Sequence, residues 1–374
     1  MFTIHKKNAK LILSDGTQYE GVSIGAKGTV FGEIVFNTSM TGYIETLTDA
    51  SYFGQIVLQT YPLIGNYGVN VNDAEGKKPQ LSGYVVKSCC NNPSNFRSEL
   101  CLKDWLVLNN VVGIEGLDTR HLTKKIREQG VMNAAITTEL NENEENIMKK
   151  IKEFKIKDAI KTVSTKSIQT MQNDDYDDRN FKICIIDFGT KENIIRNVKK
   201  LAKTVVLMPY NTTKEDILKI KPDGIVLSNG PGDPALNPNI IYNIKQIQSL
   251  NIPMFGICMG HQILALANGA RTEKLKYGHR GANQPVLDIN LNKILITSQN
   301  HGYCVIGSSI EKGIGTVSHI NANDGSCEGI EYKNIPAFSV QFHPEAAAGP
   351  LDANFLFDNF FKLITKYKNK LNYI

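Results

Sequence analysis

The stretch Pro253–Gln262 has the sequence PMFGICMGHQ, and the residues after it, ILALA at 263–267, continue in an apolar helical pattern. The apolar residues before Cys258 predict a buried strand, so the cysteine lies at a tight turn between a strand and a helix. Gly256 and Gly260 flank this turn because a Cβ would collide where strand and helix nearly touch. The thiol therefore lies at a helix N-terminus, where the dipole favours the thiolate and backbone N–H groups can bind an oxyanion.

A second stretch supplies a base and a carboxylate. AFSVQF at 337–342 predicts a strand that runs directly into His343, Pro344 and Glu345. Residues two apart in an extended chain point the same way, so Glu345 can orient the His343 ring toward a nucleophile. A bare G-x-C-x-G turn is as typical of a buried structural cysteine, and His-Pro-Glu alone is typical of a surface turn. Together, the two stretches predict a catalytic triad of Cys258, His343 and Glu345.

A third stretch, GIVLSNGPGDP at 224–234, predicts another buried strand that ends in a glycine-rich loop. Open α/β sheets bind ligands at the carboxyl ends of their parallel strands, so this loop is expected beside the cysteine turn. The two prolines are equally typical of an ordinary turn. The loop therefore gains its significance from the other two stretches.

These motifs resemble a known family. GICMGHQ (256–262), SNGPGDP (228–234) and HPE (343–345) resemble the triad class of glutamine amidotransferases. Further stretches resemble the small subunits of carbamoyl-phosphate synthases in particular: DFGTKENI (187–194), GHRGANQP (278–285), SQNHGY (298–303), FNTSMTGY (36–43) and LTDASY (47–52). The resemblance covers nearly the whole chain.

The resemblance implies that the chain hydrolyses L-glutamine through a thioester on Cys258, with His343 as base and acid and Glu345 as its orienting group. It implies an oxyanion hole made by the backbone N–H groups of Met259 and Gly230. It also implies that six further residues hold the amino-acid end of the substrate: Ser51, Gly232, Gln262, Asn300, Gly302 and Tyr303. For Ser51, a turn serine that caps the strand at Tyr52 is the alternative.

The resemblance also implies a partner. A large synthetase subunit would use ATP, Mg²⁺ and bicarbonate to convert the ammonia into carbamoyl phosphate for arginine or pyrimidine biosynthesis, within a heterodimer. This chain has neither a phosphate-binding G-x-x-x-x-G-K-[ST] motif nor a magnesium-type carboxylate cluster, so no cofactor or metal is expected on it. The alternatives are a cysteine peptidase, a γ-glutamyl hydrolase, a non-catalytic scaffold, and amidotransferases for anthranilate or GMP synthesis.

The composition is that of a soluble globular protein. Of the 374 residues, 41% are hydrophobic and 21% charged, and a net charge of +5 over this length indicates neither nucleic acid nor a membrane as partner. Seven cysteines without a C-x-x-C pair favour a reducing compartment. The start of the chain has no signal-type apolar run, and no stretch approaches membrane-spanning length. We expect a cytoplasmic protein.

The sequence divides into three regions. Residues 1–145 contain short strand-like segments separated by turns, which predict a β-rich α/β domain for docking the partner. Residues 146–180 are charged and include the acidic run DDYDDR at 174–179, so they predict a linker region. Residues 181–374 alternate strands and helices. The expected fold class is therefore α/β, with a mostly parallel sheet flanked by helices in the amidotransferase domain.

Overall fold

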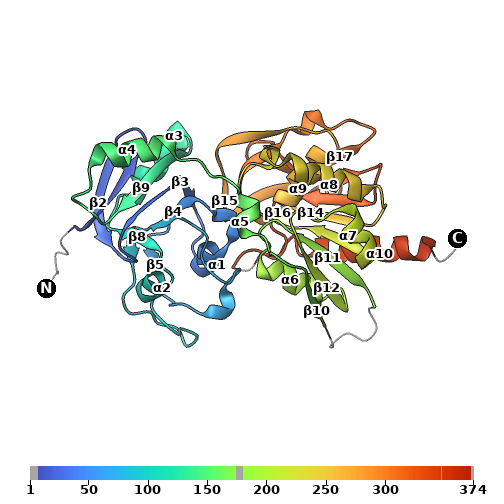
Figure 1. The fold of residues 1–374 in the computed structure, drawn as a ribbon, viewed down its shortest axis with the longest axis horizontal. Helices are drawn as coiled ribbons and strands as arrows, with labels where there is room; N and C mark the ends of the chain where they lie inside the picture. The colour runs from blue at the N-terminus through green and yellow to red at the C-terminus, as the bar shows by residue number, and fades with distance from the viewer. Residues whose placement is uncertain (1–6, 174–179, 347, 372–374) are drawn as a thin grey trace. The chain divides into compact units, whose positions relative to one another are not determined.

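The computed structural model describes residues 7–173, 180–346 and 348–371 (Figure 1). It divides into two compact units, Met1–Ala159 and Ile160–Ile374. The division falls inside the stretch 146–180 that the sequence assigns to a linker, and the acidic run 174–179 lies outside the described residues. Each unit is described by itself.

Among the described residues of the N-terminal unit, seven strands form a closed barrel in the order β1-β2-β8-β6-β4-β3-β9. The barrel strands are β1 (Ala9–Leu13), β2 (Gln18–Ser23), β3 (Thr29–Asn37), β4 (Gln55–Gln59), β6 (Gly83–Val85), β8 (Val112–Glu115) and β9 (Met132–Thr137). The other elements are α1 (Tyr43–Thr48), β5 (Leu63–Ile64), β7 (Ser88–Cys89), α2 (Leu102–Leu108), α3 (Thr119–Gln129) and α4 (Glu144–Glu153). Closure leaves no exposed sheet edge in this barrel.

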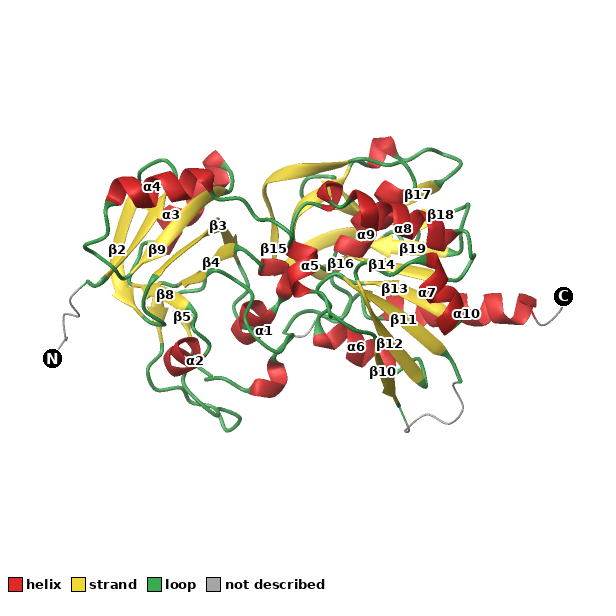
Figure 2. Ribbon diagram, viewed as in Figure 1, coloured by secondary structure: helices red, strands yellow, loops and turns green. Residues whose placement is uncertain are grey.

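Helix α4 shows how local sequence builds this unit. Its N-terminus is capped by Asn143, whose side chain accepts from the backbone N–H of Glu145 at 2.8 Å. Ile147 and Ile151 lie four residues apart, hence on one helix face, and both are buried in a cluster with Ile12 of β1. The opposite face is exposed to solvent, and Figure 2 shows α4 lying over the barrel strands.

Within the described part of the C-terminal unit, ten strands form one sheet in the order β10-β12-β11-β13-β14-β19-β18-β16-β15-β17. The strands are β10 (Gln169–Gln172), β11 (Lys182–Asp187), β12 (Thr204–Pro209), β13 (Gly224–Leu227), β14 (Met254–Ile257), β15 (Thr272–Asp288), β16 (Lys293–Val305), β17 (Gly315–Asn321), β18 (Cys327–Tyr332) and β19 (Ala337–Val340). The helices are α5 (Ala159–Val163), α6 (Glu192–Lys199), α7 (Lys214–Ile220), α8 (Pro238–Gln248), α9 (Met259–Ala267) and α10 (Phe355–Leu371).

The sheet of this unit is buried on both faces. In β11, Ile183 and Ile185 contribute to one hydrophobic cluster together with α6 and α10, whereas Cys184 and Ile186 contribute to another with α7, α8 and α9. A parallel strand covered on both faces must be almost continuously apolar, which explains the ICII sequence of β11. The helices therefore flank the sheet, and the expected α/β class is confirmed (Figure 2).

The parallel pairing joins β12, β11, β13, β14 and β19. Its carboxyl ends meet at one edge, where the loop after β13, the cysteine turn after β14 and the His-Pro-Glu segment after β19 all lie. Strands β10, β15, β16, β17 and β18 pair in antiparallel fashion and extend this sheet. The sequence patterns alone did not separate this antiparallel part from the parallel core.

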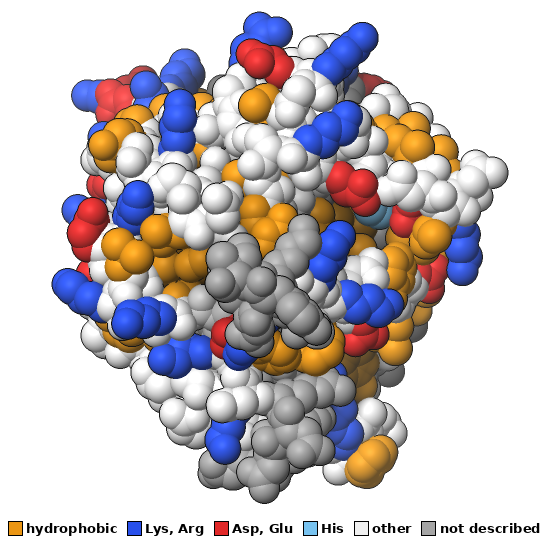
Figure 3. Space-filling view, turned by 90° about the vertical axis from the view of Figure 1, so that its right-hand side faces the viewer, with side chains coloured by type: hydrophobic (Ala, Val, Ile, Leu, Met, Phe, Trp, Pro, Cys, Tyr) orange, Lys and Arg blue, Asp and Glu red, His pale blue; other side chains and the backbone are white. Residues whose placement is uncertain are grey.

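The face drawn in Figure 3 carries side chains of both charges. Lys and Arg side chains are scattered there among acidic and apolar side chains. Of the helices within the described residues, none is both long enough and apolar enough to cross a membrane.

Candidate active site

Cys258 lies at the strand-to-helix turn between β14 and α9. Its backbone has φ +53° and ψ −102°, a conformation rare for a residue with a side chain, and the residue is only 2% exposed. Neighbouring strands hold this backbone, since its N–H donates to the Val340 carbonyl at 2.8 Å. A Cβ on Gly260 would lie 2.1 Å from the Leu227 carbonyl oxygen, so the turn requires glycine there. The strained turn fixes the thiol at the N-terminus of α9.

His343 and Glu345 are joined as the sequence predicts. Nδ1 of His343 lies 2.7 Å from Oε1 of Glu345, and both side chains are fully buried. The His343 backbone N–H donates to the Ser298 carbonyl at 2.9 Å, which ties this segment to β16. Within the described part of the chain, Nε2 of His343 has no hydrogen-bond partner. The carboxylate therefore fixes one ring nitrogen and leaves the other for chemistry.

The charges of this pair follow from its surroundings. Burial and the Lys191 charge lower the pKa of His343, but the Glu345 carboxylate and Cys258 outweigh them and raise that pKa well above its ordinary value. Burial alone would raise the pKa of Glu345, but His343 and Lys191 outweigh it and lower that pKa. Both shifts favour the charged forms, an imidazolium beside a carboxylate.

Lys191 and Asn193 are site residues that sequence reasoning missed. Nζ of Lys191 lies 3.5 Å from Oε1 of Glu345, and the Asn193 side-chain amide donates to the Glu345 carbonyl. The Lys191 backbone N–H also donates to Oδ1 of Asn229, in the glycine-rich loop, at 3.1 Å. The available signal was their position just after the carboxyl end of β11, the same sheet edge as the triad.

Several predicted substrate-binding residues lie around the cysteine. Sγ of Cys258 lies 3.8 Å from the Asn300 carbonyl oxygen, and Nε2 of Gln262 donates to the Tyr303 carbonyl at 2.7 Å. Asn300, Gly302 and Tyr303 of β16 therefore approach the first turns of α9. Gly302 lies between the other two. These roles in binding stay predictions.

The residues predicted to form an oxyanion hole, Met259 and Gly230, follow the neighbouring strands β14 and β13, and their role stays a prediction. Met259 is the first residue of α9, and Gly230 and Gly232 follow β13, which pairs with β14. A Cβ on Gly230 would lie 2.4 Å from the Phe188 carbonyl oxygen, and Gly232 has φ +91°. Both positions therefore require glycine.

Ser51 lies in the N-terminal unit, in the 3₁₀ turn Ala50–Tyr52. Its side chain is buried, and its backbone N–H donates to Oδ1 of Asp49 at 2.8 Å. The side chain that caps this turn is that of Asp49, and Tyr52 lies in the turn rather than in a strand, so the structure does not show the capping serine of the alternative interpretation. A role of Ser51 in glutamine binding stays a prediction.

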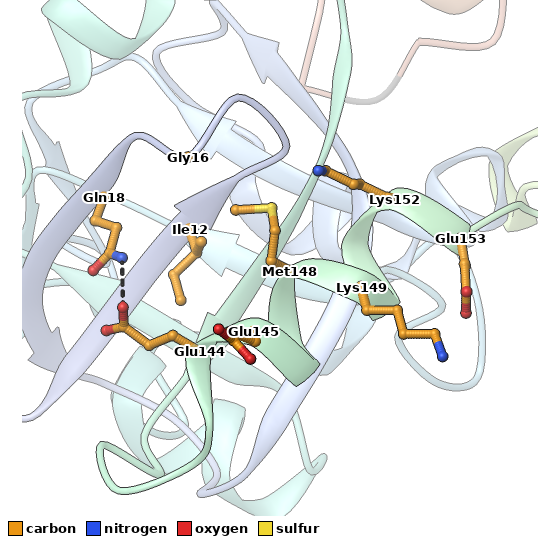
Figure 4. A pocket seen from close by; sticks show the side chains of 9 residues that line it. All are labelled: Ile12, Gly16, Gln18, Glu144, Glu145, Met148, Lys149, Lys152 and Glu153. Carbon is orange, nitrogen blue, oxygen red and sulfur yellow. Dashed lines mark hydrogen bonds between the residues drawn. The ribbon is translucent and has the colours of Figure 1, made fainter.

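A cavity of about 590 Å³ lies in the N-terminal unit beside α4 and the β1–β2 hairpin (Figure 4). Glu144 lies at its rim, accepting from Nε2 of Gln18 at 3.2 Å and from Nζ of Lys10 at 2.9 Å. The other side chains are mainly exposed Lys, Glu and Met, with no nucleophile paired to a base. The triad edge of the C-terminal unit is therefore the candidate active site.

His261, on α9, makes the fold sensitive to acid. It is fully buried with Nδ1 2.8 Å from Oγ of Ser339, and burial together with the nearby His319 lowers its pKa to about 3. An unfolded chain binds this proton near its ordinary pKa of about 6.5, so stability should fall as pH falls from there toward 3, by up to about 1.4 kcal/mol per pH unit.

Urea unfolding of wild type and His261→Gln at a series of pH values checks this prediction. The variant should lose less stability per pH unit on the acid side, whatever its stability at neutral pH. His121→Gln, which removes an exposed histidine of α3, is the control. Equal acid slopes for wild type and His261→Gln would contradict the prediction.

Comparison with known proteins places the chain in a family. A model described as "Carbamoyl-phosphate synthase small chain, CPSase domain" matches residues 11–136, and one for "Glutamine amidotransferase class-I" matches residues 184–363. Carbamoyl phosphate synthase small chains of Bacillus cereus and Staphylococcus haemolyticus are each 47% identical over 361 residues, covering 96% of this chain and 97% of theirs. A solved structure of a glutamine amidotransferase from Thermotoga maritima covers 52% of this chain and 84% of its own, with 21% identity and a TM-score of 0.36.

The matches confirm the resemblance seen in the motifs, across both halves of the sequence. They leave no place for the cysteine peptidase, the γ-glutamyl hydrolase or the other amidotransferases considered above, because residues 11–136 match the CPSase domain of this family. The chain belongs to the family of carbamoyl-phosphate synthase small chains, as the glutamine amidotransferase component of that enzyme.

Proposed function

We propose that the chain hydrolyses L-glutamine through a thioester on Cys258 and delivers the ammonia to a large synthetase subunit. The observation that carries this proposal is the buried contact of His343 with Glu345 beside a cysteine at a strained helix N-terminus. The partner would bind ATP and Mg²⁺ and make carbamoyl phosphate from bicarbonate, in the cytoplasm, for arginine or pyrimidine biosynthesis. No cofactor is assigned to this chain.

In the first half of the reaction, the Cys258 sulfur attacks the side-chain amide carbon of glutamine, and its proton resides on His343. The carbonyl oxygen becomes an oxyanion, which the backbone N–H groups of Met259 and Gly230 would stabilise. The C–N bond then breaks as His343 gives its proton to the departing nitrogen, which leaves as ammonia. The product on the protein is a thioester.

In the second half, His343 takes a proton from water, and the resulting hydroxide attacks the thioester carbon. The C–S bond breaks, glutamate leaves, and the Cys258 thiolate is restored opposite a protonated His343. Glu345 keeps the ring oriented through both halves and stabilises its positive charge. Lys191, against the same carboxylate, limits how much proton affinity Glu345 confers on the ring.

Reconstitution with the large subunit tests the proposal. The complex should make carbamoyl phosphate from glutamine, with one ammonia and one glutamate released for each glutamine consumed when bicarbonate is absent. Activity on a γ-glutamyl peptide instead of glutamine would contradict the substrate assignment.

We also expect the partner to control the reaction rate. A glutaminase that ran freely would waste glutamine, so the isolated chain should hydrolyse glutamine far more slowly than the complex. Steady-state glutaminase assays with and without the large subunit measure the difference. The N-terminal unit is proposed as the docking domain, so residues 181–374 alone should not co-elute with the large subunit in gel filtration.

Two outcomes would contradict this account of the N-terminal unit. One is full glutaminase activity of the isolated chain. The other is normal assembly by the fragment 181–374. A second fragment, residues 160–374, is the control for folding, because it retains β10, which pairs with β12 at the sheet edge.

A further inference from the structure

A buried polar cluster lies outside the triad in the antiparallel part of the sheet. It consists of His279 on β15, His301 on β16 and Glu328 on β18, and one ring nitrogen or carboxylate oxygen from each lies within 4.8 Å of the others. All three side chains are buried, and Glu328 has no exposed surface. Burying such groups is costly unless they are paired, so the cluster needs a structural or functional reason.

Two carboxylates face the two ring nitrogens of His279. Nε2 lies 2.8 Å from Oδ2 of Asp324, and Nδ1 lies 3.4 Å from Oε1 of Glu328, which also accepts from Nδ2 of Asn321 at 3.0 Å. Burial lowers the pKa of His279, but the two carboxylates outweigh it and raise that pKa. Burial also raises the pKa of Glu328, although the hydrogen bonds from His279 and Asn321 act against it.

His279 packs against His301, and both ring nitrogens of His301 have hydrogen-bond partners. The two rings meet edge to face, with centroids 4.9 Å apart and an interplanar angle of 89°. Nδ1 of His301 donates to the Tyr303 carbonyl at 2.8 Å, and Nε2 lies 3.0 Å from Oε1 of Gln299. Burial lowers the pKa of His301 well below its ordinary value.

The cluster connects to the turn that carries the nucleophile. The Tyr303 carbonyl accepts from His301 and also from Nε2 of Gln262, which lies one helical turn from Cys258. In the sequence His301 lies between Gly302 and Asn300, and the Asn300 carbonyl oxygen is 3.8 Å from Sγ of Cys258. Glu328 and His279 therefore act on the segment 300–303 through the His301 ring.

The sheet alone does not fix this segment. The β15–β16 ladder has register shifts between Lys274 and His279 and again between Gly281 and Gln284. Only the short run His279–Gly281 pairs regularly there, opposite residues 299–301. Interruptions of this kind weaken the backbone hydrogen bonding between the two strands. Side-chain contacts must therefore help to fix the position of segment 300–303.

We propose that His279 and Glu328 are positioning residues of the glutaminase site. They hold the His301 ring, and through it the Tyr303 carbonyl and the segment 300–303, in the geometry that receives the amino-acid end of glutamine. The proposal rests on the proposed function, because it assigns a role within that same site. Neither residue touches the reacting atoms, so their loss affects substrate binding more than the chemical step.

Steady-state kinetics of the assembled complex test this proposal. Glu328→Ala should raise KM for glutamine roughly tenfold to a hundredfold while kcat changes by less than about threefold, because the segment that holds the substrate is displaced. Glu328→Gln retains an oxygen that accepts from Asn321 and should recover most of the loss. Glu331→Ala removes an exposed carboxylate from the same strand and is the matched control.

Several outcomes would overturn the proposal. A loss confined to kcat, an unchanged KM in Glu328→Ala, or equal effects at Glu331 would each do so. If Glu328→Ala does not fold, KM for glutamine is measured in His279→Asn instead, and the same increase is expected. A failure of the proposed function would be seen separately, as a Cys258→Ser complex that still hydrolyses glutamine.

The spacing of the cluster also allows a metal ion, which the same assay distinguishes. Dialysis against EDTA should leave KM for glutamine unchanged. A KM that rises after EDTA treatment and is restored by Zn²⁺ in wild type, but not in Glu328→Gln, would assign the cluster to a metal ion and overturn the proposal.

Discussion

A Cys258→Ser complex should lose glutamine-dependent carbamoyl phosphate synthesis by at least about 10⁴-fold while keeping ammonia-dependent synthesis, because the triad acts only before ammonia is released. Serine differs from cysteine by one atom, so the buried turn should keep its shape. Its hydroxyl is far harder to deprotonate than a thiol, and it therefore cannot supply the nucleophile. The measurement compares product formation with glutamine and with ammonium as nitrogen source.

The control for this substitution is Cys184→Ser. Cys184 is equally buried but lies within β11 and contributes to the hydrophobic core. Its replacement places the same hydroxyl in the interior and should lower stability without removing either activity. Loss of both activities in Cys258→Ser would contradict the division of labour between the chain and its partner.

Substitution of His343 should lower glutaminase activity more than substitution of its ion-pair partner Glu345. His343→Asn should be nearly as damaging as Cys258→Ser, since it removes both the base and the acid. Glu345→Gln should retain measurable activity, with a kcat roughly 10- to 100-fold above that of His343→Asn. In Glu345→Gln, the side-chain amide oxygen at position 345 can still accept from Nδ1 of His343 across the 2.7 Å contact. The negative charge that stabilises the imidazolium is lost.

Glutaminase kcat measured for both variants in the complex decides the assignment of the carboxylate. An equal loss in both variants would make Glu345 as essential as the base. No loss at Glu345 would assign the orienting role to another group. Thermal unfolding of each variant serves as the control for folding.

Local spacing made the triad predictable from the sequence. The glycines at 256 and 260 and the apolar run before Cys258 fix the turn, and the two-residue spacing of His343 and Glu345 places them in contact, although the structure forms a turn there, after β19, instead of the extended segment that the sequence predicts. Alternation of strands and helices after residue 181 likewise fixed the α/β class. In each of these, the deciding residues lie close together in the chain.

Contacts between segments far apart in the chain could not be predicted from the sequence. Lys191 meets Glu345 only because β11 and β19 end at the same sheet edge, with β13 and β14 between them. His279 meets Glu328 only because β15, β16 and β18 pair through irregular ladders. The barrel closure of the N-terminal unit depends on parallel pairs such as β3 with β4, which no turn signal reveals.

The proposed mechanism requires the γ-glutamyl group of the substrate to become covalently attached to Cys258. Mass spectrometry of the complex, quenched in acid during turnover with glutamine and digested, tests it most directly. The account predicts a γ-glutamyl group on the peptide that carries Cys258, present in wild type and absent in Cys258→Ser. Steady turnover with Cys258 unmodified, or the adduct on another residue, would contradict it.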